Sequence, residues 1–492
     1  MAIVLLLTVI GAVLRWNGLR EHGLWLDEIG EAVTASLPMP QLLASVRSQA
    51  GAAPLDFLGV KVVTAVLGPG TTPARLWAFG MGVAAIPLAY AAASRLASSR
   101  VAGIATAICV SLSPFLILYS REARFYAMSV AGALLVILVH QWANERPARN
   151  ARWLAYGAAV AAAILTHYYL GFVAVALGIA DVIAWRMASH RRRRRMIVCR
   201  ELLAGGIALL VAGPWLISAL PFQLGRTFYW DVTGFSLDFW SGMVAMLGTA
   251  SADPDVGGTA AVLVLLVAAV AGATWRPAPS KLALGALGIV LVPLIWLLDS
   301  RSGYQVTSRQ AILLLPILYL LAGVGLGLAW TRLRRRASPS VLTAIGGTAV
   351  IAFVVAMGGA IGSVMGRSGS ASEDWPGAAR FVAATRCAGS TVFTNLGSGA
   401  AFGVAYYEPD LAGAAQQVLQ DGESFQDALG AQDPSRRDFA VVLAYAGGAD
   451  SPNVRSLGAM RAWFIEGGWE ERAFGSQLLV FHRDTCSEAP SQ

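Results

Sequence analysis

Two acidic side chains, Asp27 and Glu28, stand next to each other shortly after the first apolar run of the chain. A carboxylate in such a place can act as a general base that takes the proton from an attacking hydroxyl group. The pair could equally be structural, with Asp27 as a helix N-cap and Glu28 in the first turn. The two residues alone leave both interpretations open.

Cations and aromatic side chains occur in later segments that could join this pair. They are Arg121 and Arg124 around Glu122 in YSREARFY (119–126), Lys61, His167 with Tyr168, and Arg301, Tyr304 and Arg309 in the loop 299–309. Cations stabilise a departing phosphate, and aromatic rings bind the faces of sugars. His167 could bind a metal or a sugar, or pack in an interfacial aromatic belt. Together these residue types suit glycosyl transfer from a phosphate-linked donor.

The composition indicates a membrane protein. Of the 492 residues, 56% are hydrophobic and 13% are charged, which is too apolar for a soluble fold. Runs of roughly 20 apolar residues match a hydrocarbon core of ~30 Å. Eleven spans are predicted, at 1–15, 73–94, 101–119, 126–142, 152–166, 168–185, 201–220, 257–275, 281–298, 310–330 and 340–365.

The positive charges predict the orientation of these spans. The runs 152–166 and 168–185 are short and could form one long tilted helix. With eleven spans and the N-terminus inside, the cytoplasmic connections hold eighteen basic residues against two acids, Glu145 and Glu201. The acidic and cationic candidates and the C-terminus then lie outside the cytoplasm. Asp181, near a basic loop, is interpreted as a helix-packing or snorkelling residue.

The net charge of +8 does not indicate a nucleic-acid partner. The excess lies in the inner loops, above all in the run Arg191 to Arg195, where it signals topology and contact with anionic lipids. Residues 366–492 contain nine basic and fifteen acidic residues. Neither a P-loop nor a dinucleotide-binding fingerprint occurs in the sequence.

Residues 366–492 have the composition of a water-soluble α/β module, so the expected division is a transmembrane domain over 1–365 and an extracytoplasmic domain over 366–492. Strands are predicted at 391–394, 439–445 and 477–482, and helices near 374–386, 399–406, 423–430 and 454–467. Asp374 and Pro376 suit the start of the first of these helices. Cys387 and Cys486, the two cysteines of this region, are predicted to form a disulfide on the oxidising side.

Several motifs in order carry a family resemblance. The succession LWLDE (24–28), a segment from Pro54 to Lys61, YSREARFYAM (119–128), THYYLGF (166–172), GPW (213–215), RQAILLLPIL (309–318) and EDWPGAARFV (373–382) resembles the bacterial GT-C glycosyltransferases related to protein O-mannosyltransferases and to lipid A aminoarabinose transferases. The resemblance implies a GT-C-like polytopic α-helical fold, a polyprenyl-phosphate-linked monosaccharide as donor, and a lipid, glycan or protein of the envelope as acceptor. It also implies that the protein transfers a hexose or pentose with inversion of configuration. The reaction would take place on the outer face of a bacterial inner membrane.

The resemblance also implies roles for single residues. Asp27 would be the catalytic base, with Glu28 as its neighbour. Glu122 would match the acidic residue of the second outer loop. Lys61 and Arg309 would bind the phosphate or the sugar of the donor. Relatives usually have an aromatic residue where Asp56 stands and a tyrosine where Gln310 stands, so the donor sugar is not inferred. Glu31 adds a third carboxylate nearby. A divalent cation could bind at Asp27, Glu122 and His167, but such relatives commonly act without one, so no metal site is predicted.

Two other functions fit a polytopic chain. A flippase of lipid-linked sugars would need charges on both sides and broken helices at the membrane midplane. A non-catalytic envelope assembly protein would work through its outer domain, with Asp27 and Glu28 as a helix cap. The clustering of acids on one predicted side favours the transferase.

Overall fold

The structure is a computed structural model that describes residues 1–49, 51–224, 287, 290–291, 293–295, 309–365, 373–386, 392–394, 403–417, 441–444, 461–462 and 464–482. The chain forms two compact units. The first contains Met1–Asn17, Leu37–Pro69 and Arg75–Gly366, and the second contains Gly18–Ser36, Gly70–Ala74 and Arg367–Gln492.

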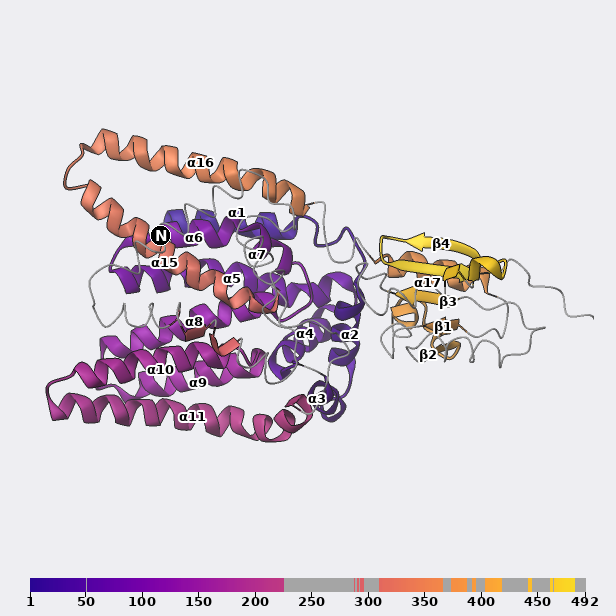
Figure 1. Cartoon of the computed structure of the whole chain (residues 1–492), viewed down its shortest axis with the longest axis horizontal. Helices are drawn as coiled ribbons and strands as arrows, with labels where there is room; N and C mark the ends of the chain where they lie inside the picture. Colours follow the sequence, from indigo (N-terminus) through magenta and orange to yellow (C-terminus); the bar gives the residue numbers. More distant parts are fainter. Residues whose placement is uncertain are drawn as a thin grey trace, which may run out of the picture. The chain divides into compact units, whose positions relative to one another are not determined.

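The first unit is helical (Figure 1). Its helices are α1 (Ala2–Trp16), α3 (Met39–Ser48), α4 (Pro54–Leu67), α5 (Thr71–Ala97), α6 (Arg100–Leu112), α7 (Pro114–Tyr119), α8 (Tyr126–Glu145), α9 (Asn150–Thr166), α10 (Leu170–Met187), α11 (Arg191–Leu224), the 3-10 turn η1 (Gln310–Leu313), α15 (Leu314–Leu333) and α16 (Pro339–Met365). The first four residues of α5 are counted with the second unit.

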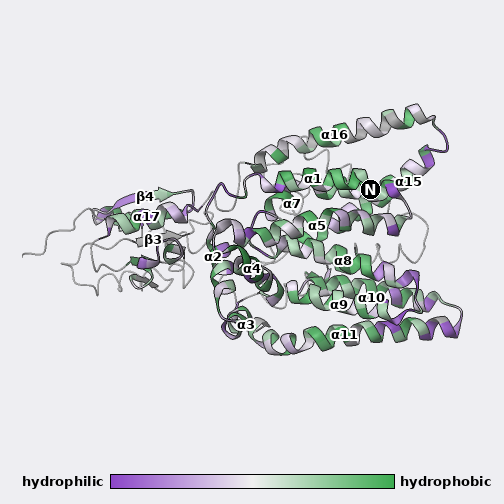
Figure 2. Ribbon diagram, turned by 180° about the vertical axis from the view of Figure 1, so that it is seen from behind, coloured by the Kyte–Doolittle hydropathy of each residue, from purple (hydrophilic) through white to green (hydrophobic). Residues whose placement is uncertain are grey.

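Many of these helices have the length and apolarity of membrane spans. In the part of the chain that the structure describes, six are long and apolar enough to cross a bilayer: α5, α8, α10, α11, α15 and α16. The apolar helices α1 and α6 are shorter. Figure 2 shows hydrophobic residues along the helices and hydrophilic ones gathered at several helix ends. The chain is therefore a multi-pass membrane protein, as the composition predicts.

The short runs 152–166 and 168–185 form two separate helices, as predicted. α9 ends at Thr166, and α10 begins at Leu170 after the connection His167 to Tyr169. At Gly157 the backbone of α9 approaches α11 so closely that a Cβ atom there would overlap the carbonyl oxygen of Ala204. The alternative of one long tilted helix is wrong.

The predicted span 101–119 is broken into two helices. α6 ends at Leu112, Ser113 is extended, and α7 begins with Pro114 at its first position. Proline has no backbone N–H and disfavours a helical residue before it, so the break follows from the sequence Ser113-Pro114. The Ser113 hydroxyl caps the new helix by accepting from Leu116 N at 3.4 Å.

The long segment between the first two predicted spans is also helical. It contains α2 (Leu26–Ser36), which belongs to the second unit, and α3 and α4 of the first. α4 begins at Pro54 and ends at Leu67, and the capping residue that follows, Gly68, has a φ of 85°, which is unfavourable for residues with a side chain. The region is thus a set of short helices rather than an open loop.

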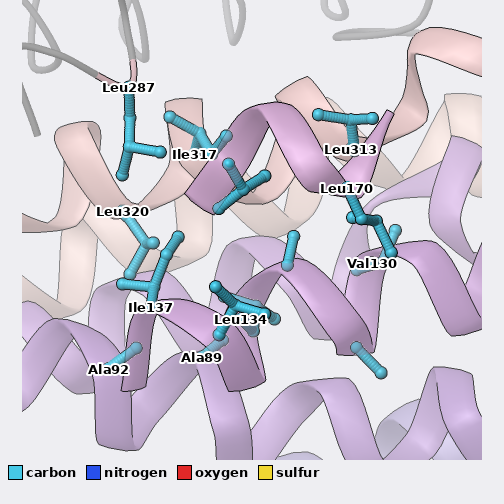
Figure 3. Packing of buried hydrophobic residues seen from close by; sticks show 14 of the residues in the cluster. Ala89, Ala92, Val130, Leu134, Ile137, Leu170, Leu287, Leu313, Ile317 and Leu320 are labelled. Carbon is cyan, nitrogen blue, oxygen red and sulfur yellow. The ribbon is translucent and has the colours of Figure 1, made fainter. Parts of the chain in front are cut away.

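One large apolar core joins the helices from α5 to α11 with η1 and α15, and a smaller one lies at α3 and α4. Figure 3 shows part of the large core, with Ala89 and Ala92 of α5, Val130, Leu134 and Ile137 of α8, Leu170 of α10, Leu287, Leu313 of η1, and Ile317 and Leu320 of α15. All of these side chains are buried. Since lipid is as apolar as this core, close packing rather than water exclusion holds such helices together.

The second unit combines α2 with an α/β module. The module has α17 (Trp375–Thr385) and the strands β1 (Val392–Thr394), β2 (Ala415–Gln417), β3 (Val441–Ala444), β4 (Glu470–Phe474) and β5 (Leu478–His482). A short 3-10 turn, η3, covers Pro409–Leu411. The sheet order is β2-β1-β3-β5-β4. β1 pairs with β2 and β3 in parallel, whereas β5 pairs with β3 and β4 antiparallel.

The three predicted strands match β1, β3 and β5. The first predicted helix is α17, and Asp374 caps it by accepting a hydrogen bond from Gly377 N at 2.9 Å. Parts of the predicted helices 399–406 and 454–467 are helical, at 403–407, 461–462 and 464–466. β2 and β4 are strands that the sequence did not predict. β4 is the edge strand with the charged sequence Glu470-Glu471-Arg472, which lacks the usual apolar strand pattern.

Several predictions lie outside the described residues. They are the span 257–275, most of the span 281–298, the helix 423–430, Tyr304, and the disulfide between Cys387 and Cys486.

Candidate active site

The acidic pair lies in the first turn of α2, where its two members differ in environment. Glu28 is completely buried, and its Oε2 accepts a hydrogen bond from Trp25 N at 3.3 Å. Asp27 is only partly buried. The alternative prediction that Asp27 is the N-cap of this helix is therefore wrong, because α2 begins at Leu26 and the residue that bonds the preceding N–H is Glu28.

The second unit holds the start of α2 through residues far away in sequence. Glu373 Oε2 accepts from Leu26 N at 3.0 Å and from the indole Nε1 of Trp375 at 2.7 Å. Leu24 N donates to the phenol oxygen of Tyr407. Burial, the largest cause, raises the pKa of Tyr407 to about 12, so the phenol stays protonated. The segment that carries Asp27 is thus fixed at two backbone N–H groups.

These supporting residues were missed as part of the site. Glu373 and Trp375 lie in the EDWPGAARFV motif, which the sequence marked only as a family resemblance. Glu31, one helical turn after Asp27 and Glu28, is buried with 1% exposure. Helical spacing puts it on the side of α2 that carries Asp27.

In the first unit the YSREAR motif forms the turn between α7 and α8. Arg121 Nη1 donates to the Asn17 carbonyl at 2.9 Å, just after the end of α1. Arg15, at 1% exposure, donates its Nε to Ser120 Oγ at 3.2 Å and its Nη2 to the Val110 carbonyl at 2.9 Å. The end of α1 and the turn therefore fix each other's position.

Four predicted site residues gather around the aromatic rings of this turn. Glu122, with 4% exposure, and Arg309 both act electrostatically on Tyr119. Arg124 acts electrostatically on His167, and its guanidinium lies 5.5 Å from the Phe125 ring centroid. The structure thus brings one carboxylate, two arginines and one imidazole into one region.

His167 ends α9 and is packed between aromatic rings. It stacks on Phe125 with ring centroids 4.4 Å apart and meets Tyr169 edge-on at 4.7 Å. Burial, and secondarily the charge of Arg124, lowers the pKa of His167, so the ring is neutral. Its buried Nδ1 has no hydrogen-bond partner in the described part of the chain. This arrangement favours the packing interpretation of His167 and leaves one ring nitrogen for a polar ligand.

Tyr168 and Lys61 have contacts of a different kind. The Tyr168 hydroxyl donates to the Ala52 carbonyl at 2.8 Å and accepts from Trp215 Nε1 at 3.0 Å. It therefore joins the segment before α4 to α11. Lys61 Nζ donates to the Leu37 carbonyl at 2.7 Å. Both residues, predicted from the sequence to contact the donor, therefore also make hydrogen bonds within the protein.

The residues that could hold a cation are of two kinds. Of the three residues considered from the sequence, Asp27 belongs to the second unit, whereas Glu122 and His167 belong to the first. A second group, His140, Asp181 and Glu201, offers three ligand atoms that lie within 4.8 Å of one another. This group comes from helices of the first unit.

Comparison with known proteins supplies a class for this fold. Residues 52–217 match the family model described as dolichyl-phosphate-mannose-protein mannosyltransferase. No curated protein sequence matches the chain significantly. The structure of ArnT from Cupriavidus metallidurans bound to undecaprenyl phosphate is similar over 100% of this chain and 99% of ArnT, with a TM-score of 0.61 and 15% identity.

A second group of similar structures is archaeal. The Archaeoglobus fulgidus oligosaccharyltransferase in complex with Zn and sulfate has a TM-score of 0.57 and 12% identity, over 90% of this chain and 68% of that one. The AglB structure from the same organism, with an inhibitory peptide and a dolichol-phosphate, has a TM-score of 0.58 and 11% identity, over 90% and 69%. The chain therefore has the polytopic GT-C fold, with an α/β module after its helices.

Proposed function

We propose that this protein is a membrane glycosyltransferase that moves one monosaccharide from a polyprenyl-phosphate carrier to a hydroxyl group of an envelope lipid, glycan or protein. The observation that carries the proposal is the full-length structural similarity to an enzyme crystallised with undecaprenyl phosphate. The match of residues 52–217 to a family of dolichyl-phosphate-mannose-dependent transferases supports the same donor class. A flippase of lipid-linked sugars is not favoured by these similarities.

Asp27 is the proposed general base. It is the partly exposed member of the acidic pair, on a helix start that Glu373 and Tyr407 hold in place. In the reaction the acceptor oxygen forms a bond to the anomeric carbon while the bond from that carbon to the phosphate oxygen breaks. The hydroxyl proton passes to Asp27, and the polyprenyl phosphate leaves with the electron pair. A single direct displacement of this kind inverts the anomeric configuration.

The proposed donor site consists of cations and aromatic groups. Lys61 and Arg309 would contact the phosphate, whose negative charge grows as the bond breaks. Arg121 and Arg124 flank Glu122, and Glu122 would orient them or the acceptor. Tyr304, His167 and Tyr168 are the proposed sugar-binding residues. The neutral state of His167 suits hydrogen bonds to sugar hydroxyls better than phosphate binding.

We further propose that the protein lies in a bacterial inner membrane, with residues 1–365 as the catalytic transmembrane domain and 366–492 as an extracytoplasmic module. The basic residues of the predicted inner loops support this orientation. Cysteine labelling at exposed positions of intact cells would test it. We expect a membrane-impermeant thiol reagent to label the Glu466→Cys variant in intact cells. If this cysteine is labelled only after the cells are broken, the orientation is wrong.

Transfer from a labelled donor tests the function directly. Purified protein is mixed with polyprenyl-phosphate-linked radiolabelled sugar and an envelope extract, and label is followed into acceptor and water fractions. We expect transfer to an extract component that depends on the protein and on an intact Asp27. A protein that moves labelled lipid across vesicles without breaking the sugar-phosphate bond would instead be a flippase.

A further inference from the structure

Three ionisable side chains outside the proposed catalytic site meet between neighbouring helices of the first unit. His140 comes from α8, Asp181 from α10 and Glu201 from α11, and α10 contacts both other helices (Figure 1). His140 lies 14 residues after the start of α8, which is about 21 Å along a helix from the YSREAR turn. The cluster is therefore separate from the proposed catalytic residues.

The three side chains point their ligand atoms toward one another. His140 Nε2 lies 2.7 Å from Asp181 Oδ2, and the carboxylates of Asp181 and Glu201 interact electrostatically. One nitrogen or oxygen from each of the three residues lies within 4.8 Å of the other two. Two carboxylates this close repel each other when both are ionised, and a proton or a cation between them removes that repulsion.

The cluster is largely buried, with His140 buried and both carboxylates partly buried. His140 is 2% exposed, and the Asp181 side chain is 15% exposed. Glu201 Oε1 is buried and has no hydrogen-bond partner among the described residues. A carboxylate inside a membrane helix bundle is costly unless it has a partner, so this oxygen indicates a missing ligand.

A buried cation lies beside the cluster. Arg200 is 6% exposed, acts electrostatically on Asp181, and lies 5.6 Å from the Trp153 ring centroid. One guanidinium offsets one of the two carboxylates. The negative charge of the second remains for a cation.

We propose that His140, Asp181 and Glu201 bind a divalent transition-metal cation of the zinc type. One imidazole nitrogen and two carboxylate oxygens are a ligand set that Zn²⁺ takes in proteins, with a fourth position left for water. The cation would take the place of the proton between His140 Nε2 and Asp181 Oδ2. Asn144, whose Nδ2 lies 3.2 Å from His140 Nε2, lies beside the metal ligands.

The role of this site is to clamp α8, α10 and α11 together. All three ligands lie within the six helices that can cross a bilayer, where no hydrophobic effect drives helix association. A metal shared by three helices supplies a directional link. The proposal does not depend on the transferase activity.

The test measures metal content and stability of the full-length protein in detergent. Zinc is added, unbound metal is removed by gel filtration, and bound zinc is counted by elemental analysis. We expect about one zinc for each chain in the wild type and at least a tenfold loss of zinc affinity in His140→Asn, Asp181→Asn and Glu201→Gln. The matched controls, His190→Gln and Glu145→Gln, alter exposed side chains of the same region and are expected to keep the zinc.

Two further measurements keep the proposal falsifiable if a variant does not fold. Chelation should lower the melting temperature of the wild type but not that of Glu201→Gln. X-ray absorption of the wild type should show nitrogen and oxygen ligands at roughly 2.0–2.2 Å. Absence of zinc in the wild type would overturn the proposal and leave a proton shared by the carboxylates. Zinc that survives all three substitutions would overturn it as well, because the metal would then lie elsewhere.

Discussion

The carboxylate of Glu373 accepts a hydrogen bond from the backbone N–H of Leu26 at 3.0 Å, although 347 residues separate the two. Leu26 is the first residue of α2, whose free N–H groups favour a negative charge. The same oxygen holds the indole of Trp375, which is completely buried in the α/β module. Asp27, the next residue after Leu26, therefore depends on the C-terminal module for its position.

We expect Glu373→Ala to loosen the start of α2 and to lower transfer activity. The change leaves Leu26 N and Trp375 Nε1 without their acceptor, and a hydrogen bond to a charged group contributes about 1.5–3 kcal/mol. Amide hydrogen exchange of residues 24–30 should become faster, and turnover should fall. Glu466→Ala, at an exposed position of the same module, is the control and should change neither. Unchanged exchange at Leu26 would contradict the positioning role.

We expect Asp27→Asn to lower turnover by ~10²–10⁴, the range that removal of a general base produces. The amide keeps the shape of the side chain but cannot take up the proton. The melting temperature should stay close to that of the wild type because Asp27 is only partly buried. Glu28→Gln provides the contrast. Its side chain caps Trp25 N, so stability should fall more than in Asp27→Asn and turnover less. Turnover of Asp27→Asn within about tenfold of the wild type would rule out this base.

Lys61→Ala and Arg309→Ala should weaken use of the donor more than use of the acceptor. Each substitution removes a charged hydrogen-bond donor to the phosphate of the donor substrate. In a site without water this loss costs a few kcal/mol of binding free energy, about as much as the loss of one oxyanion-hole donor. Steady-state kinetics with each substrate varied in turn measures the difference. Lys61→Arg, which keeps the charge, should recover part of the donor affinity. Equal effects on both substrates would instead support a structural role for Lys61 through the Leu37 carbonyl.

His167 should make folding stability depend on pH. Its pKa in the folded protein lies below the ordinary value of 6.5, so the unfolded chain takes up the proton first as the pH falls. The stability is therefore full above pH 6.5 and is lost as the pH falls toward the folded-state pKa. At pH 5.5 the loss from this one group is about 1.4 kcal/mol.

His167→Phe tests this dependence because phenylalanine can keep the stacking on Phe125. Melting temperatures of the wild type and the variant are compared at pH 7.5 and pH 5.5. The variant should lose less stability on acidification than the wild type. His190→Gln, at an exposed position, should behave like the wild type. Equal losses in all three proteins would mean that His167 is charged in the folded state.

Several parts of the fold could be predicted from local sequence. Long apolar runs predicted α5, α8 and α10, and the strands of the C-terminal module were found from their β-branched and apolar residues. Ser113-Pro114 carried the signal for the break in the third span, but the apolar run around it hid that signal. β4 was missed because its edge position allows charged residues that an inner strand excludes.

The sequence by itself determined that this protein lies in a membrane, and it placed Asp27, Glu122, Lys61 and Arg309 among the residues that could act on a phosphate-linked sugar. Apolar length and residue type are local properties, so they can be read along the chain. Only the tertiary structure decided that Glu28 is a buried cap while Asp27 is partly exposed, and that Glu373 supports Leu26. It also brought His140, Asp181 and Glu201 together. These relationships depend on how distant segments pack. The local sequence around a residue in one helix does not indicate which residues of other helices will contact it.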